Sequence, residues 1–183
     1  MQKLGIDFDG VIQDSSFLKK DYCKSNFGID IPLNQGKRGY LITNNILTES
    51  QYDQMVSDLY ETELGLEAKI VENADTVVNE LAKNYEISIV TSRSPLGVFM
   101  AKKWLSQNNF PTIEVIGTNN KDKLGALTGF DYYIDDDLSK LLPLVHQISN
   151  LYLLSWEYNQ GEKLPPEINR VNDWNEISRL LKI

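Results

Sequence analysis

The sequence contains one cysteine, Cys23, and one histidine, His146. A single cysteine cannot form a disulfide within the chain, and these two residues cannot supply the usual zinc site of cysteine and histidine ligands. A bound metal must therefore be held by carboxylate and carbonyl oxygens. Such ligands suit magnesium, manganese or calcium.

Basic residues are scarce as well, because 18 Lys and Arg stand against 26 Asp and Glu, for a formal net charge of -8. Nucleic-acid polymers and anionic membranes bind clustered Lys and Arg, so both are disfavoured as partners. A small anion is still compatible with this charge, because a local cation can reverse the field inside one pocket.

Long apolar runs are also missing. The N-terminal segment is interrupted by Asp7 before a signal-like stretch develops, and no later run is long enough to span a bilayer. We therefore expect a cytoplasmic protein whose partner is a small molecule, and the sequence leaves a homo-oligomer open.

Short β-branched or apolar runs alternate with helical patterns along the chain. The runs predict buried strands at residues 4–6, 87–90, 113–116, 132–134 and 151–154. Helical spacing of apolar residues occurs at 74–82 and 96–105, and Ser94 followed by Pro95 is a typical helix start. Alternating strands and helices predict an α/β fold with a central parallel sheet and helices on both faces.

One connection is too long for this pattern. The stretch from about Val11 to Glu72 separates the first strand from its next core helix, whereas such loops normally take a few residues. It contains helical patterns at 17–27 and 50–64. We predict a small helical cap at 15–66, inserted after the first strand, and a core made of 1–14 and 67–183.

Polar groups follow several of the predicted strands, and these strand ends meet at one edge of a parallel sheet. They are Asp7-Phe8-Asp9-Gly10, Thr91-Ser92-Arg93, the loop with Lys121 and Lys123, and Asp135-Asp136-Asp137. Two carboxylates about 4 Å apart repel by roughly 4 kcal/mol at an effective dielectric near 20. A divalent cation and one lysine would remove this repulsion, and oxygen ligands suit magnesium.

These four groups, in this order, resemble the four motifs of the haloacid dehalogenase superfamily, over essentially the whole chain. The resemblance implies a Rossmann-like, three-layer core with a cap, and Asp7 as nucleophile with Asp9 as general acid and base. It also implies that Thr91 and Lys121 bind the phosphoryl group. Magnesium would be held by Asp7, Asp9, Asp135 and Asp136. An acid at residue 9 is typical of the phosphatases in this superfamily rather than of its dehalogenases.

Other residues leave alternatives open. Lys123 competes with Lys121, and we favour Lys121 because it precedes the expected helix and can point back to the site. The backbone of Ser92 could contact phosphate or form a simple turn. Arg93 could bind a substrate phosphate or pair with a surface acid. Lys37 and Arg38 could contact the substrate or could simply be exposed to solvent.

The predicted function is a magnesium-dependent phosphomonoesterase that acts through an aspartyl phosphate. The cap, residues 91–93 and residues 173–177 resemble the 5′(3′)-deoxyribonucleotidase group, which implies nucleoside monophosphates as substrates. A phosphatase for sugar phosphates or phosphoglycolate is the alternative. Two other classes fit less well: a receiver-type signalling domain would lack the long insertion, and the loop after Asp7 lacks the remaining ligands of a calcium-binding EF-hand.

Overall fold

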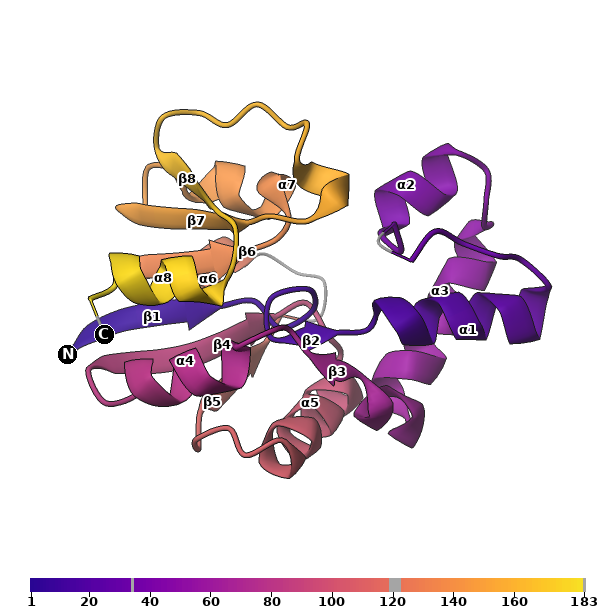
Figure 1. Ribbon diagram of the computed structural model, residues 1–183, viewed down its shortest axis with the longest axis horizontal. Coiled ribbons are helices and arrows are strands. Elements are labelled where there is room, and N and C mark those ends of the chain that lie inside the picture. Colours follow the sequence, from indigo (N-terminus) through magenta and orange to yellow (C-terminus); the bar gives the residue numbers. More distant parts are fainter. Residues whose placement is uncertain (34, 119–122, 183) are drawn as a thin grey trace.

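The computed structural model describes residues 1–33, 35–118 and 123–182. Its centre is a six-stranded sheet with strand order β5-β4-β1-β6-β7-β8, in which every neighbouring pair is parallel (Figure 1). The strands are β1 (Gln2–Ile6), β4 (Tyr85–Thr91), β5 (Glu114–Gly117), β6 (Tyr132–Asp135), β7 (Asn150–Leu154) and β8 (Ile168–Val171). The predicted α/β fold is confirmed, and β8 is an addition.

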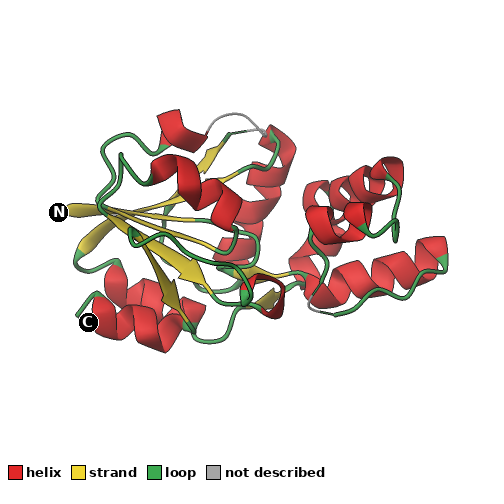
Figure 2. Cartoon of the chain, turned by 90° about the horizontal axis from the view of Figure 1, so that it is seen from above, coloured by secondary structure: helices red, strands yellow, loops and turns green. Residues whose placement is uncertain are grey.

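Helices cover both faces of the sheet (Figures 1 and 2). They are α4 (Ala74–Leu81), α5 (Pro95–Gln107), α6 (Lys123–Ala126), α7 (Leu138–Leu141) and α8 (Trp174–Leu180), with short 3-10 turns η2 (Leu142–Leu144) and η3 (Glu157–Asn159). Apolar residues of α4, α5 and α8 share one buried cluster, and those of α7 share another. The Ser94 hydroxyl accepts a hydrogen bond from Gly97 N at 3.2 Å, as expected for the start of α5.

The stretch after β1 forms a helical unit of its own, which we call the insert. It consists of α1 (Ser16–Phe27), α2 (Arg38–Thr43), α3 (Glu49–Glu61) and the 3-10 turn η1 (Glu63–Glu67). Thr48 caps α3 in a reciprocal capping box with Gln51. The insert has its own small apolar cluster, which includes Tyr22, Leu41 and Met55. Its helices therefore pack on one another rather than on the sheet.

A short ribbon joins the insert to the core. Strands β2 (Gln13–Asp14) and β3 (Lys69–Ile70) pair antiparallel, so both chain crossings lie side by side. Figure 1 shows the ribbon between the sheet and α1. The Trp104 indole N–H donates to the Ala68 carbonyl at 3.0 Å, which ties the start of β3 to helix α5. No helix within the described ranges has the length and apolar character needed to cross a membrane.

Candidate active site

The loop after β1 positions the two aspartates of the first motif. The amide of Asp7 donates to the Ile134 carbonyl at 2.9 Å, so Asp7 continues the pairing of β1 with β6. Gly10 follows with φ +86°, and a Cβ built there would lie 2.1 Å from Asp136 Oδ2. The Trp156 indole donates to the Gly10 carbonyl at 2.7 Å and the Trp174 indole to the Val11 carbonyl at 2.8 Å. The turn is thus fixed from two sides.

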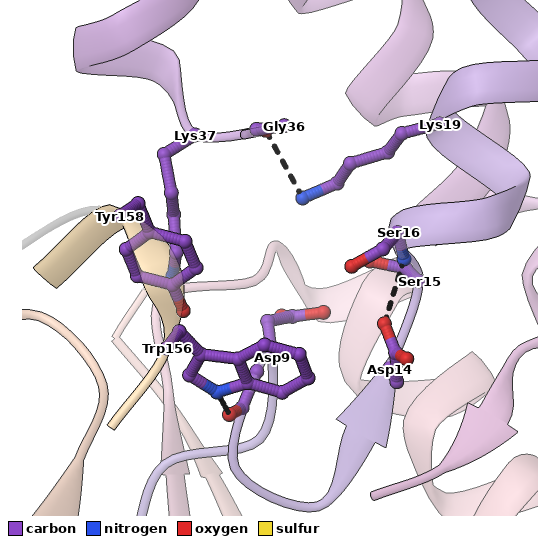
Figure 3. Close-up of a pocket in the computed structure, with 10 residues that line it drawn as sticks. Asp9, Asp14, Ser15, Ser16, Lys19, Gly36, Lys37, Trp156 and Tyr158 are labelled. Carbon is purple, nitrogen blue, oxygen red and sulfur yellow. Dashed lines mark hydrogen bonds between the residues drawn. The ribbon is translucent and has the colours of Figure 1, made fainter. Parts of the chain in front are cut away.

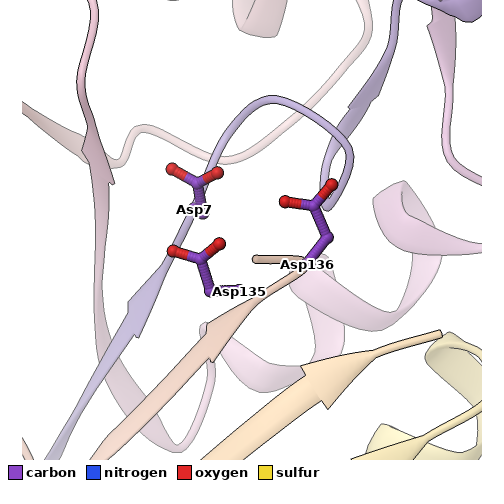
Figure 4. A group of neighbouring side chains, drawn as sticks. All are labelled: Asp7, Asp135 and Asp136. Carbon is purple, nitrogen blue, oxygen red and sulfur yellow. The ribbon is translucent and has the colours of Figure 1, made fainter. Parts of the chain in front are cut away.

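Three buried carboxylates meet at the carboxyl ends of β1 and β6. Asp7, Asp135 and Asp136 each offer an oxygen, and these oxygens lie within 4.8 Å of one another (Figure 4). Lys123 faces two of them: its Nζ is 2.7 Å from Asp7 Oδ1 and 3.2 Å from Asp135 Oδ2. The Tyr133 hydroxyl donates to Asp135 at 2.8 Å. Residues from three of the four motifs therefore lie together at this edge of the sheet.

The cluster carries more negative charge than Lys123 can neutralise. Burial raises the pKa of Asp7 to about 8; Lys123 opposes the shift, whereas the carboxylates of Asp135 and Asp136 add to it. Burial likewise raises the pKa of Asp136. Asp136 Oδ1 is buried without a hydrogen-bond partner among the described residues. Three converging carboxylates with one such oxygen suit a divalent cation bound by oxygen.

Asp9 does not join this cluster. Its carboxylate forms a bidentate pair with Arg93, at 3.0 Å from Nε and 2.7 Å from Nη2. Arg93 is buried, also donates to Gln13 Oε1 at 2.6 Å, and lies over the Tyr60 ring at 4.1 Å. Burial alone would raise the pKa of Asp9, but Arg93 lowers it below its ordinary value.

This pairing bears on two expectations. The Asp9 side chain contacts the Arg93 guanidinium, whereas the three carboxylates grouped within reach of one cation are those of Asp7, Asp135 and Asp136, and the assignment of Asp9 as a metal ligand stays a prediction. Arg93 meets an acid, as one alternative held, but that acid is the buried Asp9 rather than a surface group.

Two of the phosphoryl-binding candidates, Thr91 and Ser92, lie in one cavity. Asp7, Thr91, Ser92 and Lys123 line a cavity of about 540 Å³ between the core and the insert. Thr91 ends β4, is buried, and its Oγ1 accepts from the Arg93 amide at 3.3 Å. Across the same cavity, Ser94 Oγ donates to Glu61 Oε1 at 2.5 Å, which links α5 to the insert.

The two candidate lysines have different outcomes. Lys121, which the sequence favours, lies outside the described residues. The lysine that the structure places between Asp7 and Asp135 is Lys123, the first residue of α6. Sequence patterns locate a helix start only to within a few residues, and this uncertainty covers the spacing between the two lysines.

The two basic residues of the insert loop also differ. Lys37 forms an ion pair with Asp136, and its Nζ lies 5.0 Å from the centre of the Tyr158 ring. Tyr158 itself donates to Asp136 through its hydroxyl. Arg38 instead pairs with Glu49 and, at 2.7 Å, with Asp53 on the insert surface. Of the two, Lys37 reaches the carboxylate cluster.

Sequence reasoning missed other residues near the site. Lys19 of α1 is buried and points into a small adjoining cavity of about 30 Å³, together with Trp156 and Tyr158 (Figure 3). The signal was available for Lys19, because it shares the inward side of α1 with Tyr22 and Cys23, three and four residues later. A lysine on such a face is unusual. No comparable pattern marks Trp156 or Tyr158.

The fold is that of haloacid dehalogenase-like hydrolases. A hydrolase of this superfamily from Streptococcus pneumoniae superposes with a TM-score of 0.66, at 18% identity and 98% coverage of both chains. A predicted phosphoglycolate phosphatase from Haemophilus somnus gives 0.63 at 15% identity, covering 100% of this chain and 98% of its own. A protein described as a "putative HAD-hydrolase" from Bacillus subtilis, solved bound to magnesium, superposes with a TM-score of 0.58 at 15% identity, covering 100% of this chain and 99% of its own. The resemblance seen in the motifs is thus confirmed at the level of the fold.

More particular relatives are found by sequence, although no model of a known protein family matches the chain. Two curated proteins both bear the name "Putative nucleotidase". The one from Oceanobacillus iheyensis is 29% identical over 137 residues, which cover 72% of this chain and 71% of the relative. The other, from Halalkalibacterium halodurans, is 23% identical over 179 residues, which cover 96% of this chain and 90% of the relative.

Proposed function

We propose that the protein is a magnesium-dependent phosphomonoesterase in which Asp7 is the nucleophile. The observation that carries this proposal is the convergence of Asp7, Asp135 and Asp136 around Lys123, next to a cavity that also contains Thr91. This arrangement combines a carboxylate nucleophile with a lysine and a hydroxyl that can bind phosphoryl oxygens. The chain's fold, shared with hydrolases, supports the same reaction class.

The residues divide the reaction into two steps. A carboxylate oxygen of Asp7 attacks phosphorus while the ester oxygen leaves and takes a proton from Asp9. Asp9 then accepts a proton from water, which attacks the phosphorus of the aspartyl phosphate and releases inorganic phosphate. Lys123 and Thr91 stabilise charge on the transferring oxygens. Magnesium, held by Asp7, Asp135 and Asp136, would neutralise the same developing charge.

Arg93 sets a condition on the first step. It holds Asp9 in the ionised form, which suits the base of the second step but not the acid of the first. Asp9 must therefore leave Arg93 when substrate binds and take up one proton, from solvent or from the substrate phosphate, before it protonates the departing ester oxygen; the second step returns that proton to Asp9 from water. We assign Arg93 to the positioning of Asp9, and not to direct substrate contact.

We further propose that the substrates are nucleoside monophosphates, with deoxyribonucleotides preferred, and that residues 15–66 act as a substrate-selecting cap. The shared name of the two curated relatives supports this. The cavity of about 540 Å³ also suits a ligand of nucleotide size and is lined by Tyr52 and Tyr60 of α3, whose rings could contact a base. Phosphoglycolate or a sugar phosphate is the second candidate, favoured by the basic residues that the insert directs at the cavity.

A substrate panel tests the proposal. We would measure kcat/KM for dUMP, dTMP, UMP, AMP, phosphoglycolate and glucose 6-phosphate at one magnesium concentration, with EDTA and with magnesium restored. We expect turnover that requires the cation and favours a nucleotide. An advantage of more than about tenfold for a non-nucleotide, roughly 1.4 kcal/mol in transition-state binding, would reject the nucleotidase assignment and leave the phosphatase assignment standing.

A further inference from the structure

We propose that Lys19 anchors a second anion site, so that a phosphate ester with another anionic group on its alcohol part binds more tightly than the same ester without that group. This inference rests on the proposed phosphatase function and narrows its substrate class. The observation behind it is that the buried Lys19 ammonium group faces the cavities and has no ion-paired carboxylate among the residues that the structure describes (Figure 3).

No carboxylate among the described residues lies within ion-pair distance of Lys19, and the charge of Asp9 acts on it only from farther away. The side chain belongs to a residue that is only 8% exposed, and the same is true of Lys123. Lys123 has two carboxylates in contact, whereas the described residues form no ion pair with Lys19. Its Nζ has the Gly36 carbonyl at 3.4 Å and lies 5.7 Å from the centre of the Tyr60 ring. An ammonium group has three donors and is costly to bury unpaired, so this position suits an anionic ligand.

The place of Lys19 separates it from the phosphoryl site. It lines the small cavity with Asp9, Lys37, Trp156 and Tyr158, and this cavity is not lined by Asp7. Lys19 also lines the larger cavity, so the two spaces meet at its side chain. Because Asp9 protonates the leaving oxygen in the proposed reaction, an anion at Lys19 lies on the side of the alcohol.

A second ammonium adds to the positive potential there. Lys37 lines both cavities together with Lys19, and its own ion pair is with Asp136. Two like charges at close range favour an anion between them. A carboxylate or a phosphate group on the alcohol would supply it. Phosphorylated hydroxy acids and nucleotides with a second phosphate share this chemistry.

Matched ligand pairs test the inference by equilibrium binding. The protein would carry Asp7→Asn in every arm, to prevent turnover, with magnesium present. Calorimetry would compare dUMP with deoxyuridine 3′,5′-bisphosphate, and ethyl phosphate with phosphoglycolate. We expect the ligand with the second anionic group to bind at least tenfold more tightly in one pair or both. The pair with the larger ratio of dissociation constants shows whether the site prefers a phosphate or a carboxylate.

Substitutions then assign the preference to Lys19. Lys19→Met should reduce the preference to less than threefold, Lys19→Arg should retain most of it, and Lys24→Met, an exposed lysine on the same helix, should leave it unchanged. An equal loss for all four ligands would place Lys19 on the phosphoryl group and overturn the inference. The inference is also overturned if the protein with Lys19 intact shows no preference for the ligands with a second anionic group. This outcome does not depend on whether Lys19→Met folds. Failure of the proposed function is separate, because it would appear as missing phosphate release by the unmodified protein.

Discussion

The edge of the sheet and the helical insert supply charged groups to the same cavity, but they hold them differently. On the core side, Asp7 is paired with Lys123 and Asp9 with Arg93, and the backbone of each is fixed at a strand end or an indole-tied turn. On the insert side, Lys37 is paired with Asp136 of the core, whereas Lys19 has no carboxylate partner among the described residues. In the proposed reaction, the paired core groups are held in place before substrate arrives, whereas Lys19 of the insert is left to bind a substrate anion.

The largest effect should come from the nucleophile on the core side. We expect Asp7→Asn to reduce kcat by about 10⁴-fold or more, because a neutral amide oxygen cannot replace the attacking carboxylate. Phosphate release from dUMP, with circular dichroism to confirm folding, measures this. A kcat within tenfold of the original value would show that Asp7 is not the nucleophile. The core would then no longer differ from the insert as the region that carries out the reaction.

A smaller loss should follow from the general acid and base. Asp9→Asn should lower kcat by about 10²- to 10⁴-fold, the usual range for one such group. Because Asp9 also activates water in the proposed reaction, the aspartyl phosphate should persist longer, and mass spectrometry of acid-quenched protein would detect the added phosphate on Asp7. Wild-type turnover would show that the carboxylate paired with Arg93 has a structural role only.

Substitution of Lys121 and Lys123 in turn would show which of the two lysines takes part in the reaction. Lys123→Met should reduce kcat by about 10²- to 10³-fold, since it removes a charged donor beside the transferring oxygens and leaves Asp7 and Asp135 without their common counter-ion. Lys121→Met is the matched control, with an expected change below about threefold on the same scale. The reverse order would restore the assignment that the sequence favours.

Packing inside the insert should matter for recognition more than for the metal. Leu41→Ala removes a fully buried side chain from the insert cluster and should cost about 2–5 kcal/mol of unfolding free energy. We expect KM and kcat to change together, by about tenfold, because a cap must close over the substrate. Urea unfolding and calorimetric titration with magnesium would be compared. Loss of magnesium binding would mean that core and insert are not independent.

The smallest effect concerns the contact that joins both regions. Lys37→Gln should tighten magnesium binding by a few-fold, because the Lys37 ammonium competes with the cation for Asp136. Direct titration of the protein with magnesium measures it, and Arg38→Gln, which changes a surface ion pair of the neighbouring residue, is the control. Weaker magnesium binding in Lys37→Gln would instead make Lys37 a support of the metal site.

The sequence predicts the chemistry of the core better than its contacts. Asp7, Thr91 and Asp135 could be located because each lies at or directly after the end of a buried strand. Parallel strands bring their carboxyl ends to one edge of the sheet. Strand β8 escaped notice because its four residues have only Ile168 and Val171 buried, a pattern too short to identify. The Asp9–Arg93 pair spans 84 residues, and local periodicity holds no information on contacts of that range.

The insert was predictable as an element but not as part of a site. Its excess length and two of its helical patterns predict α1 and α3, whereas the six residues of α2 have no comparable signal. Lys37 and Arg38 looked equivalent in the sequence. Which of them reaches Asp136 depends on how the loop before α2 meets the core, and this is decided by tertiary packing.

The ribbon of β2 and β3 makes the insert one continuous segment whose two ends lie side by side. Asp14 and Lys69 are paired across it, so everything between them leaves and re-enters the core at one point. A segment with adjoining ends can be exchanged or shortened without stretching the rest of the chain. Substrate range could therefore change by replacement of one continuous piece of gene, while the catalytic carboxylates outside it keep their coding sequence.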